Sequence, residues 1–224
     1  MVGDLLDASA FRCLRLVATE AWWQSHPKYA SMTAECFVVS PAEMQRVSLL
    51  QTPQDVLAVF ALPTGQQALQ ASPQQLTLLL DEVQDPGNLG TIIRTADWFG
   101  VRHIYCTPGT ADCYNPKVVQ ATMSALARVS LHYFDDKADC CEWLKQRSCP
   151  IYGTFLDGTD IYRSELASQG VLVMGNEGRG VSAEIAQCVT HRLLIPSFSP
   201  DGAHVESLNV SIATAVCLSE LRRR

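Results

Sequence analysis

The chain has 224 residues, of which 47% are hydrophobic and 18% are charged, so it can bury a sizeable core and has room for one or two domains. The formal net charge of −6 excludes a protein coated with nucleic-acid-binding cations, so any such site must be local. No apolar run approaches the roughly 20 residues that a membrane helix needs, and the first residues lack the basic and apolar regions of a signal peptide. We therefore expect a cytoplasmic protein without a membrane segment.

The nine cysteines form no recognisable framework. Their number is odd and none are spaced as Cys-x-x-Cys, which indicates neither a set of disulfides nor a zinc site. Most have apolar neighbours, as Cys106 and Cys217 do, so we interpret them as small buried hydrophobic residues. Cys140 and Cys141 are adjacent on a predicted surface helix, and we do not expect them to be redox-active. We expect no bound metal.

Residues 1–62 alternate apolar clusters with helical patterns and predict a small α/β unit. Within this unit, Trp22, Trp23 and Tyr29 are candidates for stacking on RNA bases, but paired aromatic residues before a proline favour a hydrophobic plug. Residues 63–75 combine proline, glycine and glutamine without periodicity, which is typical of a linker.

Residues 76–224 alternate short apolar runs with helical patterns. The run at 76–83 has an unbroken apolar centre, which suits a strand buried on both faces of a parallel sheet. Further strands are predicted at residues 103–106, 131–134, 151–155, 171–174 and 193–195. Helices are predicted at residues 89–99, 116–125, 137–147, from about 182, and at 208–221, with a loop at 157–160. This alternation predicts the α/β class, with a parallel sheet and helices on both of its faces.

The last predicted helix, 208–221, has an unusual composition. It carries only five polar side chains, so apolar residues cover nearly its whole circumference and it requires burial on two sides. Ser207 or Asn209 can cap its N-terminus. The preceding stretch, 197–206, contains proline, glycine, serine and aspartate and is expected to be an exposed loop.

Three polar loops each follow a predicted buried strand. The first, DPGNLG, opens the helix at 89–99; the second, GNEGRG, spans 175–180; the third leads into the last helix. In a parallel sheet all three open at the same edge, where open α/β sheets bind their ligands. The polar side chains that can converge there are Asn88, Arg94, Glu177, Ser207 and Asn209.

The second loop is not a nucleotide-binding fingerprint. GNEGRG lacks both the G-x-G-x-x-G spacing and a P-loop lysine, so NAD and ATP are poorly supported. In the first loop, Arg94 lies one turn beyond Gly90 and away from the apolar stripe of its helix. We expect Gly90 to let a ligand or a partner backbone approach the arginine.

The three loops resemble the motifs of a known family. N-x-G-x-x-x-R-x-A begins at Asn88, G-N-E-G-x-G begins at Gly175, and I-P followed by S-L-N-V-S-x-A begins at Ile195 and Ser207. Together they resemble the three motifs of the SpoU (TrmH-type) RNA ribose 2′-O-methyltransferases of the SPOUT superfamily. The resemblance covers about residues 76–224.

This resemblance implies a methyltransferase domain at 76–224 with a C-terminal trefoil knot, although knots are rare in proteins. It implies S-adenosylmethionine as the cofactor, tRNA or rRNA as the substrate, and a homodimer with active sites at the interface. Residues 1–62 resemble part of an L30e-like substrate-binding domain that lacks its start. The implied cofactor-binding residues are Thr154, Gly175, Asn176, Gly178, Gly180, Ile195, Pro196 and Leu208. The implied catalytic residues are Asn88, Arg94, Glu177, Ser207 and Asn209.

Several alternatives remain open at this stage. A ribose 2′-hydroxyl must lose its proton, and the acceptor is either a substrate phosphate oriented by Arg94 or the carboxylate of Glu177. Residues 197–206 are longer than in most family members, so this loop either alters substrate entry or bulges into solvent. The rival functions are a non-catalytic RNA-binding dimer and a methyltransferase that acts on a non-RNA small molecule.

Overall fold

The computed structural model describes residues 1–33, 35–63, 74–199 and 207–223. The chain divides into two compact units, Met1–Gly65 and Gln66–Arg224. Most of the predicted linker at 63–75 lies outside the described residues. The linker and the identification of the first unit as an L30e-like domain stay predictions.

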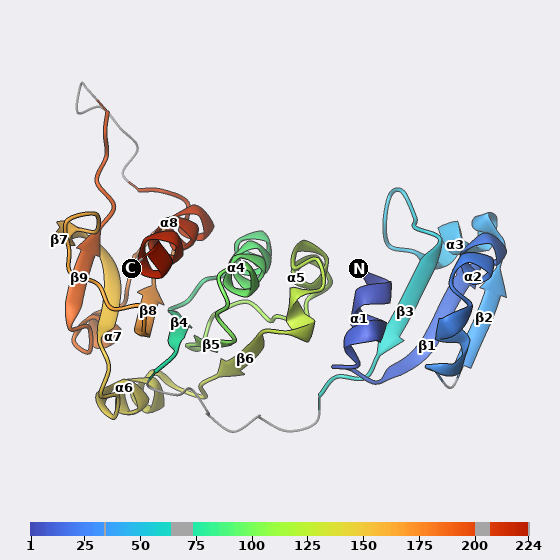
Figure 1. The fold of residues 1–224 in the computed structure, drawn as a ribbon, viewed down its shortest axis with the longest axis horizontal. Coiled ribbons are helices and arrows are strands. Elements are labelled where there is room, and N and C mark those ends of the chain that lie inside the picture. The colour runs from blue at the N-terminus through green and yellow to red at the C-terminus, as the bar shows by residue number, and fades with distance from the viewer. Residues whose placement is uncertain (34, 64–73, 200–206, 224) are drawn as a thin grey trace. The chain divides into compact units, whose positions relative to one another are not determined.

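The first unit is a three-stranded sheet with short helices (Figure 1). Its strands are β1 Cys13–Thr19, β2 Glu35–Val39 and β3 Val56–Phe60, and its helices are α1 Val2–Ala8, α2 Glu20–Ser25, the 3-10 helix η1 Pro27–Ser31 and α3 Pro41–Val47. The central strand β1 pairs in parallel with β2 and antiparallel with β3. Tyr29 is buried and stacks on Trp22, while Trp22 and Trp23 pack against the core. The predicted hydrophobic plug is confirmed.

The second unit is built on a six-stranded sheet in which every strand pairing is parallel. Its strands are β4 Leu76–Leu80, β5 His103–Cys106, β6 Ser130–Tyr133, β7 Ile151–Asp160, β8 Gly170–Met174 and β9 His191–Leu194. Its helices are α4 Pro86–Trp98, α5 Pro116–Ala121, the 3-10 helix η2 Ala125–Ala127, α6 Lys137–Lys145, α7 Ala183–Ala186 and α8 Val210–Arg223. The strand order is β6-β5-β4-β8-β7-β9.

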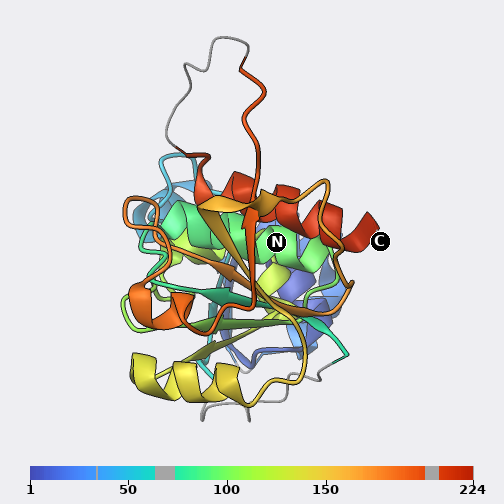
Figure 2. The ribbon, with the colours of Figure 1, turned by 90° about the vertical axis from the view of Figure 1, so that its left-hand side faces the viewer.

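Helices cover both faces of this sheet, as predicted. Helix α4 packs against α5 and α8, and α6 packs against α7. Figure 2 shows α4 in green and α8 in red on one side of the strands, and α6 in yellow on the other. Every residue of β4 and β8 is buried, because each strand is sandwiched between two helical layers.

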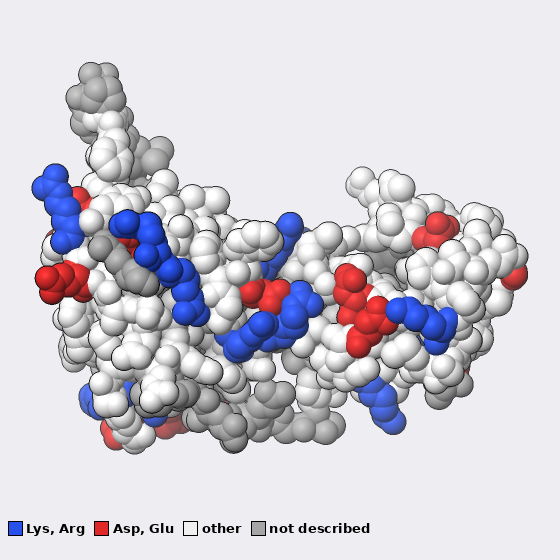
Figure 3. Space-filling model, in the orientation of Figure 1, with Lys and Arg blue, Asp and Glu red and all other residues white. Residues whose placement is uncertain are grey.

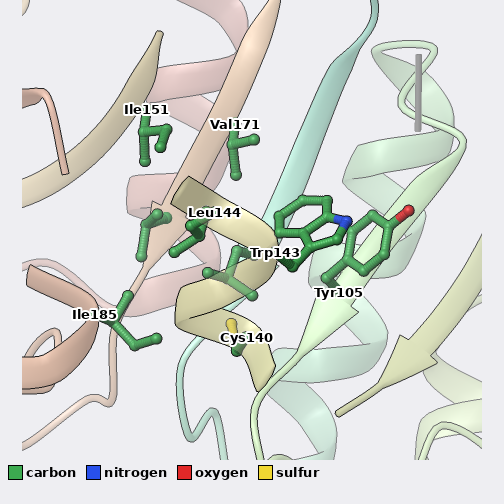
Figure 4. Close-up of a cluster of buried hydrophobic side chains, with 9 residues drawn as sticks. Tyr105, Cys140, Trp143, Leu144, Ile151, Val171 and Ile185 are labelled. Atoms are coloured by element: carbon green, nitrogen blue, oxygen red, sulfur yellow. The ribbon is translucent and has the colours of Figure 1, made fainter. Parts of the chain in front are cut away.

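A cluster of aromatic and aliphatic side chains fixes the layer of α6 and α7 against the sheet (Figure 4). The Tyr105 ring of β5 lies against the Trp143 ring of α6, with 4.2 Å between the centroids. Leu144 and Ile185 are fully buried in the same cluster. Since full burial of one such side chain contributes about 1.5–3 kcal/mol, α6 is held firmly on the sheet. The backbone of Lys137, the first residue of α6, is therefore held in place relative to the sheet.

Strand β7 is longer than predicted. Residues 157–160 continue the strand instead of forming a loop, and both Thr154 and Thr159 pair with Leu193 of β9. The chain bulges between these two pairings. Gly158 permits the bulge, because a Cβ atom at this position would lie 2.4 Å from the carbonyl carbon of Leu193. The loop prediction was wrong because the contact that shapes this stretch comes from a later strand.

Other boundaries shift by a few residues. Helix α5 ends before the predicted 125, since Met123 and Ser124 have positive φ values of 50° and 73°. Strand β9 ends one residue before Ile195. The trefoil knot stays a prediction, because residues 200–206, between β9 and α8, lie outside the described part of the chain.

Candidate functional site

The strand order reverses between β4 and β8. From β4 the chain steps outward to β5 and β6. It then crosses to the other side of β4, where it forms β7, next β8 directly beside β4, and finally β9 at the edge. Open α/β sheets bind ligands at the carboxyl ends of the strands at such a switch point. The carboxyl end of β4 leads to α4, and that of β8 leads to the GNEGRG loop.

Three of the predicted polar residues meet in a hydrogen-bonded chain at this edge. Asn88 Nδ2 donates to Glu177 Oε1 at 2.9 Å, and Asn209 Nδ2 donates to Asn88 Oδ1 at 2.9 Å. Each residue comes from a different loop; Glu177 and Asn209 are exposed, and Asn88 is half-buried. The predicted convergence of the loops is therefore confirmed for these three residues, while their roles in a reaction stay predictions.

Helix capping places two members of this chain. Asp85 caps α4 and accepts a hydrogen bond from the Asn88 amide at 2.7 Å. Asn209 precedes α8, and its Oδ1 accepts from the Ser211 amide at 3.0 Å and from the Ser211 hydroxyl at 2.6 Å. Free N–H groups in the first helical turn attract such acceptors. Asn209 thus caps α8 with its oxygen and reaches Asn88 with its nitrogen, which confirms one of the two predicted caps.

The GNEGRG loop is a tight turn that places Glu177 at its tip. Asn176 and Gly180 exchange two backbone hydrogen bonds of 2.9 Å each. Asn176 Oδ1 accepts from the amides of Gly178 and Arg179, and its Nδ2 donates to the Glu82 carbonyl at 2.8 Å. The polar atoms of Asn176 are therefore occupied in shaping the loop.

Gly175 is required by this turn. A Cβ atom there would lie 2.3 Å from both the carbonyl carbon of Gly180 and the amide nitrogen of Val181. A close backbone approach of this kind is available only to glycine. The close packing of the turn therefore requires glycine at position 175, and a role in cofactor binding stays a prediction.

Arg94 and Ser207 lie outside the hydrogen-bonded chain. Arg94 is exposed on α4, and within the described residues the structure assigns its guanidinium no hydrogen bond or ion pair. Ser207 is exposed at the start of the segment that leads into α8. The expectation for Gly90 is wrong: a Cβ atom there would lie 2.5 Å from the Ala121 Cβ, so this glycine accommodates α5 instead of a ligand.

Most of the residues predicted to bind a cofactor lie just beyond the carboxyl ends of β8 and β9, whereas Thr154 lies within the neighbouring β7 and Leu208 lies just before α8. Thr154 pairs with Leu193 in the ladder between β7 and β9, and Gly175 directly follows β8. Ile195 and Pro196 follow β9 and are half-buried, whereas Leu208 is 47% exposed. Gly178 and Gly180 belong to the turn, and a Cβ at Gly180 would meet nothing within 4 Å. These positions share the edge of the sheet that carries Glu177.

One cluster near this edge was not anticipated from the sequence. Glu82 follows β4 with a positive φ of 58°, and its carboxylate pairs with Lys137 Nζ at 2.5 Å and with Arg179. The hydrogen bond from Lys137 lowers the pKa of Glu82, against a smaller opposing effect of burial. In the sequence, this cluster is indicated only by the two adjacent acidic residues, Asp81 and Glu82, at the end of a buried strand. That pattern does not predict that Lys137 and Arg179 bind Glu82.

Several basic side chains on this unit pair with acidic ones. In Figure 3 the blue and red side chains on the visible face are interspersed. Arg102 and Arg128, for example, both pair with Asp97, at 3.0 and 2.7 Å. Within the described ranges, no group of three or more His, Cys, Asp or Glu side chains could hold a metal ion, and no helix is long and apolar enough to cross a membrane.

The parallel sheet, the switch point and the three converging motif loops define an α/β methyltransferase of the SPOUT type. The model of the SpoU rRNA Methylase family matches residues 75–219, and the chain belongs to that family. The fold class predicted from the sequence is confirmed, since the same fold occurs in solved methyltransferase structures.

Three similar proteins illustrate this relationship. A 23S rRNA (guanosine(2553)-2′-O)-methyltransferase, RlmP, from Bacillus subtilis is 33% identical over 84% of this chain and 73% of its own length. The structure of a candidate RNA methyltransferase of the TrmH family from Porphyromonas gingivalis matches 99% of this chain and 86% of that one, at 44% identity and a TM-score of 0.82. An rRNA methyltransferase from Sinorhizobium meliloti with bound S-adenosylmethionine matches 99% of this chain and 84% of that one, at 27% identity and a TM-score of 0.84.

Proposed function

We propose that the chain transfers a methyl group from S-adenosylmethionine to a ribose 2′-hydroxyl of RNA. The observation that carries this proposal is the hydrogen-bonded chain of Asn88, Glu177 and Asn209 at the switch point. It joins one polar side chain from each motif of the family to which the protein belongs. We also propose that the reaction takes place in the cytoplasm.

The strand ends suit an adenosine-containing cofactor. Ligand sites are mostly apolar, with a few backbone groups that fix orientation. Ile195 and Leu208 supply partly exposed apolar side chains, and within the described part of the chain their backbone groups carry no assigned hydrogen bond. The residues we propose for holding S-adenosylmethionine are Thr154, Gly175, Gly178, Gly180, Ile195, Pro196 and Leu208, with Asn176 shaping the loop. When bound, the cofactor supplies an electrophilic methyl group.

The chain's own residues prepare the acceptor. Asn88 donates to Oε1 of Glu177, and among the described residues Oε2 has no assigned hydrogen bond, so Oε2 can accept one from a substrate hydroxyl. A guanidinium is a poor proton acceptor because it already carries its full set of protons near neutral pH, so we assign Arg94 to binding a substrate phosphate. Ser207 and Asn209 orient substrate or neighbouring groups. The proton passes either to Glu177 or to the phosphate that Arg94 holds.

We propose ribosomal RNA as the substrate class. The family model is that of the rRNA methylases, and the relative from Bacillus subtilis is named for 23S rRNA. Mapping 2′-O-methyl groups in RNA from cells with and without the gene tests this assignment. A site lost from tRNA instead of rRNA would contradict the substrate class and leave the reaction intact.

We also propose that the protein is a homodimer that uses α8. The inner face of this helix is fully buried through Leu218 and Leu221, yet Ile212 on its outer face is 52% exposed. On the neighbouring α4, Trp98 is 86% exposed one turn beyond Arg94. Exposed large apolar side chains on adjacent helices are typical of an interface. A second copy covering this surface would bring its own side chains close to Arg94.

Cofactor binding decides between this function and its rivals. Calorimetric titration with S-adenosylmethionine in the presence of a chelator should give saturable binding, since the proposed site uses no metal. Absence of binding up to millimolar concentration would favour the non-catalytic RNA-binding dimer. Binding without methyl transfer to RNA would favour a small-molecule substrate.

A further inference from the structure

The turn after β4 is tied to the loop that carries Glu177. Asp81 is completely buried, and its two carboxylate oxygens accept from the Thr107 hydroxyl at 2.9 Å and from the Ser182 amide at 2.7 Å. Ser182 lies just after the GNEGRG loop. Asp81 therefore holds the exit of that loop against the end of the central strand.

Glu82 holds the same loop at two further points. Its carbonyl accepts from Asn176 at the start of the loop, at 2.8 Å. Its carboxylate binds Arg179 in the second half of the loop, and it binds Lys137 of α6 at 2.5 Å. Glu177 lies between the two anchored loop residues, so its backbone has little freedom to move away from Asn88.

The backbone conformation of Glu82 indicates that the surrounding contacts hold this residue in place. Its φ of 58° lies in the left-handed region, which is unfavourable for any residue with a Cβ atom. Such conformations persist where surrounding contacts impose them, and they are enriched at functional sites. The Glu82 amide is bound to the Thr107 hydroxyl at 3.0 Å, and its carboxylate has two cationic partners.

The same turn also sets the other partner of the hydrogen bond. Asp85, three residues beyond Glu82, caps α4 and receives the Asn88 amide. One short segment therefore determines where both Asn88 and Glu177 lie. Lys137 extends this segment to α6, which is fixed to the opposite face of the sheet by Trp143 and its neighbours.

From these contacts we infer that Glu82, clamped by Lys137 and Arg179, is a positioning residue that holds Glu177 in hydrogen-bonding register with Asn88 for methyl transfer. This inference rests on the proposed methyltransferase function. None of the three charged residues needs to touch the substrate, because they act through the position of the loop. A displacement of about 1 Å at a reacting group can cost on the order of 100-fold in rate.

The variant Glu82→Gly tests the inference. Glycine suits the left-handed backbone, so the fold and the backbone bonds to Thr107 and Asn176 are retained while the carboxylate is lost. We expect single-turnover methylation of RNA to fall about 10- to 100-fold, with affinities for S-adenosylmethionine and RNA within about threefold of the wild type. Arg179→Ala should lower the rate in the same way, whereas Arg179→Lys should restore part of it. Because the residues act as one unit, the double variant should be little slower than Glu82→Gly alone.

Glu184→Gln is the matched control. Glu184 is an exposed glutamate on α7 whose charge also acts on Lys137, but the structure assigns its side chain no hydrogen bond or ion pair with residues 175–180. Its loss should leave the methylation rate unchanged. A similar fall in this control would mean that local charge, and not anchoring of the loop, sets the rate, and it would overturn the inference.

A second readout does not depend on activity. The side-chain amide of Asn88 donates to Glu177, so its hydrogen exchange in NMR spectra reports the register directly. Exchange should accelerate in Glu82→Gly and in Arg179→Ala. Unchanged exchange, or a wild-type methylation rate in Glu82→Gly, overturns the inference. A wild-type protein that binds RNA and cofactor but never methylates RNA refutes the proposed function instead, and the exchange measurement still decides the positioning role. Should Glu82→Gly fail to fold, Arg179→Ala carries the test, since the Arg179 side chain is 65% exposed.

Discussion

Arg94→Ala separates chemistry from folding more cleanly than any other substitution at the site. Arg94 is exposed on α4 and has no assigned hydrogen bond or ion pair within the described residues. Arginine and alanine are both good helix formers, and exposed substitutions of this kind change stability by about 0.5 kcal/mol or less. The melting temperature should therefore stay within a few degrees of the wild type.

The expected loss of rate is much larger. Removing a cation that positions a phosphate and stabilises a developing alkoxide typically costs about 10²- to 10³-fold, or about 2.7–4 kcal/mol of transition-state stabilisation. The groups proposed to hold S-adenosylmethionine, such as Gly175, Ile195 and Leu208, do not include this side chain. Cofactor affinity should therefore survive the substitution.

The assay combines three measurements on the purified variant: melting temperature, calorimetric affinity for S-adenosylmethionine, and single-turnover methylation of RNA. Arg163→Ala is a suitable control, because the Arg163 side chain is 86% exposed and pairs only loosely with Asp160, at 3.5 Å. It should leave all three values unchanged. Near-normal methylation by Arg94→Ala, or loss of its fold or cofactor binding, would refute the role assigned to the arginine.

Three further outcomes follow from the described contacts. Ile212→Asp places a charge on the exposed apolar face of α8, so we expect it to convert a dimer to folded monomers in analytical sedimentation; a wild type that is itself monomeric contradicts the dimer. Gly175→Ala would bring a Cβ within 2.3 Å of the Gly180 backbone, so it should destabilise the fold by about 1–3 kcal/mol in chemical denaturation, and an unchanged midpoint would count against the tight turn. The hydrogen bond from Lys137 lowers the pKa of Glu82 from 4.5, so its contribution to stability is complete above pH 4.5 and is lost as the pH falls through the lowered value. Glu82→Gly should thus lose less stability than the wild type between pH 6 and pH 3 in thermal melts, and equal losses would contradict this linkage.

Local patterns were sufficient to predict most of the second unit. Leu76–Leu80 and Gly170–Met174 are apolar throughout and buried throughout, because a parallel strand between two helical layers has no solvent-facing side. The cap at Asn209 follows from an amide side chain just before an apolar helix. Convergence of the loops follows from the parallel arrangement, since all strand ends of one sense share an edge.

The features that escaped prediction depend on contacts between distant segments. The sequence around Gly158 predicts a loop, but the contact with Leu193 makes it part of a strand. The sequence around Gly90 suggests an opening for a ligand, but α5 packs against this glycine. Likewise, no local pattern joins Glu82 to Lys137 and Arg179, which come from three separate stretches of the chain. Sequence periodicity reports which face of an element is buried, but it does not report what covers that face.

The structure also separates residues that a motif treats alike. Asn176 and Glu177 are neighbours in GNEGRG, but their side chains have different partners. The Asn176 side chain hydrogen-bonds within the loop and to the Glu82 carbonyl, whereas the Glu177 side chain accepts a hydrogen bond from Asn88. Within a single residue, Asn209 caps α8 with its oxygen and binds Asn88 with its nitrogen. A match to the motif therefore identifies the edge of the sheet where we propose that the reaction takes place, whereas the hydrogen bonds identify which polar atoms of the described side chains are already occupied. Among the described residues, Glu177 Oε2 and the Arg94 guanidinium carry no assigned hydrogen bond, so both can contact a substrate, and we propose that both take part in methyl transfer.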